Sequence, residues 1–182
     1  MRFISVLSFS LLLSACVPVF ASQGDLQLAL LSQAKDLNPK VLDYALYAAG
    51  VAAKRGEVSN KNILTVIDFS LPSTQKRLWT FDLTNRSLLF HEWVAHGKDS
   101  GENMTVHFSN DLSTVMSSVG LYRTDVTYFG KNGYSLRLVG LDKGFNDTVY
   151  DRAVVLHGAW YVSQKMIDEF GRLGRSWGCP AV

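Results

Sequence analysis

The residue best suited to chemistry in this chain is a cysteine close to the end of the sequence. Cys179 stands between a glycine and a proline, and His157 precedes it in the chain, directly after an apolar run at 154–156. A cysteine attacks as the thiolate, and a histidine within reach can take its proton and later protonate a leaving amine. We therefore expect Cys179 to be a nucleophile and His157 its general base.

The residues around the cysteine favour a tight turn. Gly178 allows a strained backbone conformation, and the N–H groups of Gly178 and Cys179 can then face the oxyanion of a tetrahedral intermediate. Ser176 can brace this turn, or the ring of His157, by hydrogen bonding. The alternative for Cys179 is a small buried apolar residue, the common state of free cysteines.

The first 21 residues have the pattern of an export signal. A positive start at Arg2 precedes an apolar run at 3–13 that is too short to span a bilayer, and small residues follow. Two processing sites compete: cleavage after Ala21, which we favour slightly, and a lipobox-like site that would leave a lipid anchor on Cys16. Either outcome leaves Cys179 without a partner for an intrachain disulfide.

The composition indicates one globular domain that does not bind nucleic acid. Of 182 residues, 47% are hydrophobic and 19% charged, which is typical of a folded chain with a full core. The 18 basic and 16 acidic residues leave a net charge of +2 without a basic run. The four histidines (His91, His96, His107 and His157) lack the compact spacing of zinc ligands, so we expect no metal.

The elements that must position the cysteine and histidine are mainly strands. Apolar residues at helical spacing predict helices over 25–36 and 39–55, the second with Asn38 as its N-cap. Short β-branched and aromatic runs then predict antiparallel strands over 63–69, 77–83, 88–95, 135–141 and 154–156, with a hairpin turn at 84–87. A short helix is expected over 163–170. The predicted organisation is a signal at 1–21 (1–15 for a lipoprotein), a helical segment at 22–60 and a catalytic domain at 61–182.

Several motifs resemble one known family. His157-Gly158 followed by Ser176-Trp177-Gly178-Cys179 resembles the His-Gly and Ser/Thr-His-Gly-Cys signature of YkuD-like L,D-transpeptidases of bacterial cell walls, and is closest to the murein L,D-transpeptidase catalytic domain branch. Further similar stretches occur in order over 63–182, at 94–101, 108–110, 117–120, 135–138 and 172–181. The resemblance implies a mainly β (α+β) catalytic domain, a YkuD-like mixed β-sandwich or barrel preceded by N-terminal helices.

The resemblance also implies a reaction and a place for it. Cys179 would attack the L,D-peptide bond of a peptidoglycan tetrapeptide stem, with His157 as base and acid, and form a thioester. An amine would resolve it as a transpeptidase, or water as an L,D-carboxypeptidase, and no metal or organic cofactor would be needed. The expected location is the periplasm or cell envelope, with membrane contact only through an anchor at Cys16. No oligomeric state is predicted.

The sequence departs from the family pattern at two points. Trp177 replaces the histidine of the signature, and we expect it instead to cover the acyl site or to pack beneath it. The sequence stops three residues after Cys179, where similar proteins continue into a closing strand. We therefore expect the C-terminal end of the domain to be missing; were Val182 the natural end, a sheet edge beside the site would be left unpaired.

Other residues are candidates for substrate contact, each with a structural role as the alternative. Arg137 alternates with leucines in a strand and can pair with a stem carboxylate. Arg152 and Arg175 flank the two catalytic segments. The candidate substrate-binding residues are His96, Gly97, Ser118, Arg137, Gly158, Arg175 and Trp177.

Two other functions compete with this prediction. A papain-like cysteine peptidase normally places its cysteine before its histidine, and the order here is the reverse. A non-catalytic murein-binding envelope protein or lipoprotein would keep the fold without the reaction. The presence of both Cys179 and His157 argues against such a degenerate site.

Overall fold

The structure is a computed structural model that describes residues 23–182. The expected export signal and Cys16 lie outside the described residues. Within these residues, two three-stranded antiparallel sheets and three α-helices make up the fold, which confirms the predicted mainly β (α+β) class. Within the described part of the chain, no helix is both long and apolar enough to cross a membrane.

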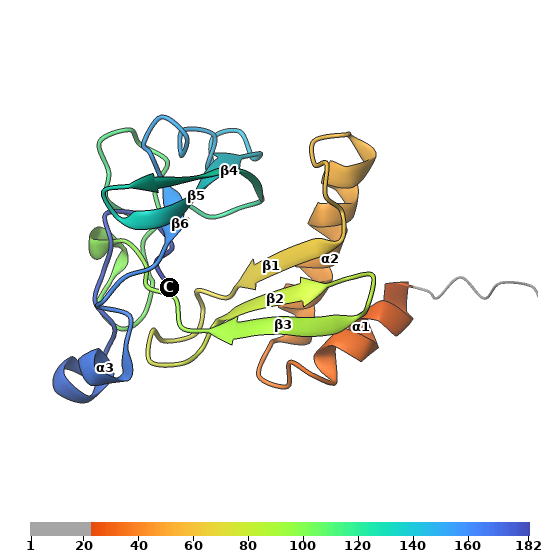
Figure 1. Cartoon of the computed structure of the whole chain (residues 1–182), viewed down its shortest axis with the longest axis horizontal. Coiled ribbons are helices and arrows are strands. Elements are labelled where there is room, and N and C mark those ends of the chain that lie inside the picture. Colours follow the sequence, from red (N-terminus) through yellow and green to blue (C-terminus); the bar gives the residue numbers. More distant parts are fainter. Residues whose placement is uncertain (1–22) are drawn as a thin grey trace, which may run out of the picture.

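The first half of the molecule is a sheet covered by two helices, at the right of Figure 1. Strands β1 (Ile63–Ile67), β2 (Leu78–Asp82) and β3 (Ser87–Glu92) pair in chain order. Helices α1 (Gln23–Leu31) and α2 (Pro39–Lys54) contribute Leu30, Leu42 and Leu46 to a buried cluster that includes Trp79 and Phe81. Asn38 caps α2 as predicted, since its side chain accepts a hydrogen bond from the Lys40 N–H at 2.9 Å.

The second half is the sheet β4-β5-β6, at the upper left of Figure 1. It consists of β4 (Tyr122–Gly130), β5 (Gly133–Gly140) and β6 (Val155–His157), and the short helix α3 (Gln164–Phe170) follows. A single 3-10 turn, η1 (Lys98–Ser100), lies between the sheets in the sequence. We did not predict β4, because its residues 123–127 are exposed and show no apolar alternation.

The segment after Cys179 joins the two halves of the fold, and in Figure 1 the C-terminal end lies between the sheets. Ala181 forms bridges with Ala95, which follows β3, and with His157 at the end of β6. Val182 donates to the carbonyl of His157 at 2.9 Å and accepts from Ala159 at 2.7 Å. This segment therefore bridges the end of β6 and the residues that follow β3.

Candidate active site

The cysteine lies in a braced turn at the junction of the two sheets. Its side chain is 8% exposed, and the Val155 N–H donates to its Sγ at 3.5 Å. Gly178 adopts a φ of 106°, a region that favours glycine. The Ser176 hydroxyl donates to the Cys179 carbonyl at 2.6 Å and accepts from the Gly178 N–H at 3.2 Å. Ser176 thus holds both ends of the turn.

These hydrogen bonds determine which backbone N–H group is available to bind an oxyanion. The Gly178 N–H is already used by the Ser176 hydroxyl. The Cys179 N–H, in contrast, has no hydrogen-bond acceptor among residues 23–182. Of the two amides expected to face an oxyanion, that of Cys179 is the one available.

The histidine lies on the strand next to the cysteine, and its tautomer is fixed. His157 is 6% exposed, and its Nδ1 lies 2.9 Å from the carbonyl oxygen of Gly158. A carbonyl only accepts, so Nδ1 carries a proton, and the tautomer of the uncharged ring has its lone pair on Nε2. Nε2 is therefore able to accept a proton.

The register brings the two side chains to neighbouring positions. Val155 of β6 meets Cys179 through the N–H···Sγ contact, and two residues further on His157 bridges Ala181 in parallel. Positions two apart on adjacent strands share a face. No hydrogen bond joins the Cys179 thiol to the imidazole in the described structure, so the ring and the thiol must approach each other for proton transfer.

Burial sets the protonation state of the Cys179 thiol. Removal from water raises the pKa of the Cys179 thiol above its ordinary value, while the Val155 N–H and the nearby Arg152 charge act in the opposite direction. The thiol is thus neutral at pH 7 and needs a base to become reactive. The arrangement is a protonated thiol next to an imidazole that can act as this base.

A comparison with protein families agrees with this geometry. The model of the L,D-transpeptidase catalytic domain matches residues 33–182, which include α2, both sheets, His157 and Cys179. The chain belongs to this family. The resemblance noted from the motifs is therefore confirmed. No curated protein and no solved structure matches the chain significantly.

Two of the residues considered for substrate contact in this L,D-transpeptidase domain are instead internal supports. The Gly97 N–H donates to the Ser117 hydroxyl at 3.0 Å, and a Cβ on Gly97 would lie 2.2 Å from the carbonyl oxygen of Val115. Ser118 is 6% exposed, and its hydroxyl donates to the Ser109 carbonyl. Both residues hold the 109–118 segment in place.

His96 does not line a cleft, contrary to one of our two expectations for it. Its side chain is completely buried, and its Nδ1 lies 2.8 Å from Nη2 of Arg77. Because a guanidinium only donates, Nδ1 accepts and Nε2 donates to the Gly101 carbonyl at 3.2 Å. Burial, with Arg77 adding repulsion, lowers the pKa of His96 to about 4. The ring is a neutral part of the core.

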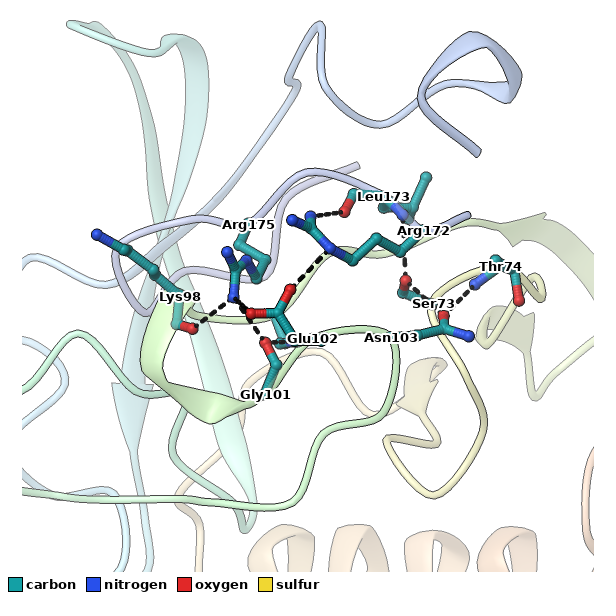
Figure 2. A network of polar contacts seen from close by, with 10 residues as sticks. Ser73, Thr74, Lys98, Gly101, Glu102, Asn103, Arg172, Leu173 and Arg175 are labelled. Atoms are coloured by element: carbon teal, nitrogen blue, oxygen red, sulfur yellow. Dashed lines mark hydrogen bonds and ion pairs between the residues drawn. The ribbon is translucent and has the colours of Figure 1, made fainter. Parts of the chain in front are cut away.

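Arg175 is also engaged within the fold (Figure 2). Its Nη1 lies 2.6 Å from Oε1 of Glu102, and Nε of Arg172 lies 2.9 Å from Oε2 of the same carboxylate. Arg175 donates in addition to the carbonyls of Lys98 and Gly101. Glu102 therefore ties the segment that leads to Cys179 to the loop after η1.

Three candidate residues remain accessible. Trp177 is 80% exposed, two positions before the nucleophile, and Gly158 is exposed beside His157. The Arg137 guanidinium lies 4.7 Å from the ring centroid of Tyr128 and 5.5 Å from that of Tyr150. It has no carboxylate or hydrogen-bond acceptor among the described residues. The Arg137 side chain is thus positioned by the two tyrosine rings, and its N–H groups remain available to a ligand.

We did not predict from the sequence that two arginines, Arg77 and Arg152, support the fold through hydrogen bonds. Arg77 is fully buried and donates to the carbonyls of Val94 and Leu71, and burial lowers its pKa to about 10. Nothing in its sequence neighbourhood distinguishes it from a surface residue. Arg152 was considered only for substrate contact, and its position shortly before His157 in the sequence was the available signal.

Proposed function

We propose that the protein is an exported, cysteine-dependent L,D-transpeptidase that acts on peptidoglycan tetrapeptide stems, with L,D-carboxypeptidase hydrolysis as a side reaction. The observation that carries the proposal is the placement of a buried Cys179 thiol and a buried His157 at neighbouring positions, with Nδ1 of His157 engaged by the Gly158 carbonyl and Nε2 left for proton transfer. Family membership supports the reaction class and the stem-peptide substrate. The assignment of the individual steps is our own.

Acylation begins with proton transfer from the Cys179 thiol to Nε2 of His157. The thiolate attacks the carbonyl carbon of the third stem residue, and the carbonyl oxygen becomes an oxyanion that the Cys179 N–H can receive. The C–N bond then breaks, and the imidazolium returns its proton to the departing amine of D-Ala. The product is a thioester on Cys179.

Deacylation repeats the same proton transfers with a new nucleophile. An amine of a second stem, or water, loses a proton to His157 and attacks the thioester carbonyl. The thiolate leaves and regains the proton from the imidazolium. The amine gives a crosslink and water gives a tripeptide stem, so the outcome depends on how the acceptor is held.

Two accessible side chains are suited to holding the donor stem. Arg137 shares a face of β5 with Ser135, which pairs with His157. Its free guanidinium donors match a stem carboxylate. Trp177, exposed next to the nucleophile turn, can cover the bound acyl group and exclude water. Export, with or without a lipid at Cys16, rests on residues 1–21 of the sequence alone.

The experiment is to incubate the protein with purified tetrapeptide muropeptides and to follow D-Ala and crosslinked or tripeptide products by mass spectrometry. We expect D-Ala release that is abolished in C179A and reduced at least a hundredfold in H157Q. Release that survives in C179A would overturn the mechanism. Binding of muropeptides with no product from any substrate would instead identify a non-catalytic binding protein.

A further inference from the structure

Arg152 holds the 109–118 segment through a single guanidinium. Its Nη1 donates to the Ser118 hydroxyl at 2.7 Å and to the Ser109 carbonyl at 3.2 Å. Its Nη2 donates to the carbonyls of Met116 at 2.6 Å and Thr114 at 3.3 Å. One side chain from the turn before β6 thus fixes four points of a segment that lacks regular secondary structure.

The same guanidinium lies directly against the nucleophile turn. A Cβ built on Gly178 would be 2.9 Å from Nη2 of Arg152 and 3.1 Å from the Met116 carbonyl oxygen. The Ser117 hydroxyl, in the segment that Arg152 holds, lies 3.5 Å from the Gly178 carbonyl oxygen, to which it donates. Only glycine at position 178 leaves room for this contact.

The charge of Arg152 is not neutralised by an ion pair. Its four acceptors are carbonyls and a hydroxyl, and no carboxylate lies within ion-pair distance of it in the described structure. The ionisable groups that act on it are Tyr122, the Cys179 thiol and the exposed Asp111. The thiol in turn faces Arg152 and Tyr161, with His157 on the neighbouring strand. Arg152 is therefore the one cation beside the thiol in residues 23–182 whose charge acts on it.

We propose that Arg152 is the positioning residue of the nucleophile. It presses the 109–118 segment against the Gly178–Cys179 turn, and its charge favours the thiolate and the oxyanion that forms next to it. Burial disfavours the thiolate, and the charge of a guanidinium packed against the adjacent Gly178 offsets part of that penalty. The proposal rests on the proposed function only in taking Cys179 as the nucleophile.

The test is the rate of Cys179 alkylation by iodoacetamide as a function of pH, a readout that does not depend on any peptidoglycan substrate. In R152Q we expect the midpoint of the profile to move up by about one pH unit, and the rate at pH 7 to fall about tenfold. R123Q, which removes an equal charge from an exposed position on β4, should keep the wild-type midpoint. A folded R152Q with the wild-type midpoint would refute the proposal.

A second variant separates the charge from the hydrogen bonds. R152K keeps the charge but cannot make four bonds to the 109–118 segment. We expect its alkylation midpoint to stay within about 0.3 pH units of the wild type, while its kcat for D-Ala release falls about tenfold. If R152Q does not fold, R152K decides: a midpoint raised by a full unit despite the retained charge would refute the charge role. Alkylation that behaves as expected without any D-Ala release would refute the proposed function alone.

Discussion

Acidification should destabilise the protein through His96. In the native state the ring is fully buried, and Arg77 donates to its Nδ1, so a protonated ring would face a like charge at 2.8 Å. The native pKa is about 4, whereas a histidine in an unfolded chain has a pKa of about 6.5. Between these two values the unfolded chain binds a proton that the native protein does not.

The sign and size of the effect follow from this difference. Where the unfolded state binds more protons, the free energy of unfolding rises with pH, so it falls as the solution is acidified. The slope is about 1.4 kcal/mol per pH unit, and the whole window from about pH 6.5 to pH 4 amounts to about 3 kcal/mol. That is a large part of the 5 to 15 kcal/mol or so that stabilises a typical domain. Above about pH 6.5 the contribution is fully present.

The assay is urea unfolding at intervals between pH 7.5 and 4, compared for wild type, H96N and H107N. An asparagine at position 96 does not titrate, so its curve should be flatter in this window by about 3 kcal/mol. The exposed His107 is the matched control, and H107N should keep the wild-type slope. The comparison is between the slopes of the free energy of unfolding against pH, so a loss of stability in H96N that is equal at every pH does not affect it. Equal slopes for wild type and H96N would refute the buried, neutral assignment of this ring.

Three further predictions concern single positions. G97A should lose activity and melt at a lower temperature, because its Cβ would overlap the Val115 carbonyl. G158A should melt as the wild type does, because its Cβ would lie 3.9 Å from the nearest atom, the Val182 carbonyl oxygen. Thermal melts followed by circular dichroism test this, and equal melting temperatures for the two variants would contradict it. N38A should lower the free energy of unfolding by about 1 kcal/mol through the lost N-cap, measured by urea unfolding; no change would argue against the cap. W177A should leave that free energy within about 0.5 kcal/mol of wild type, because the ring is 80% exposed, yet raise the KM for tetrapeptide stems; an unchanged KM would remove Trp177 from the site.

Patterns of residue type and spacing in the sequence predicted most of the helices and strands. The alternation in β1 and β2 and the helical spacing after Asn38 match the structure closely, because each of these elements buries one face in a common core. Strand β4 escaped prediction because its residues 123–127 are exposed, so no apolar pattern marks it. Its pairing with β5 comes from backbone hydrogen bonds that the sequence does not display.

Sequence motifs identified the candidate residues of the site, but they could not predict which of these residues lie together in the fold. The dipeptide His-Gly occurs twice, at His96-Gly97 and at His157-Gly158. The first histidine is completely buried in the interior, whereas the second ends the strand β6 that lies next to the Cys179 segment. The difference arises from tertiary contacts with Arg77 and with the C-terminal segment. The position of Arg152 against Gly178 likewise depends on two segments that are distant in the sequence.

The most direct test of the central claim is the intact mass of the protein during reaction with a tetrapeptide stem. We expect a species heavier than the free protein by the acyl group of the tripeptide, located on the peptide that contains Cys179, absent from C179A and lost on treatment with hydroxylamine. Steady D-Ala release without this thioester, or an adduct on another residue, would contradict the assignment of Cys179 as the nucleophile.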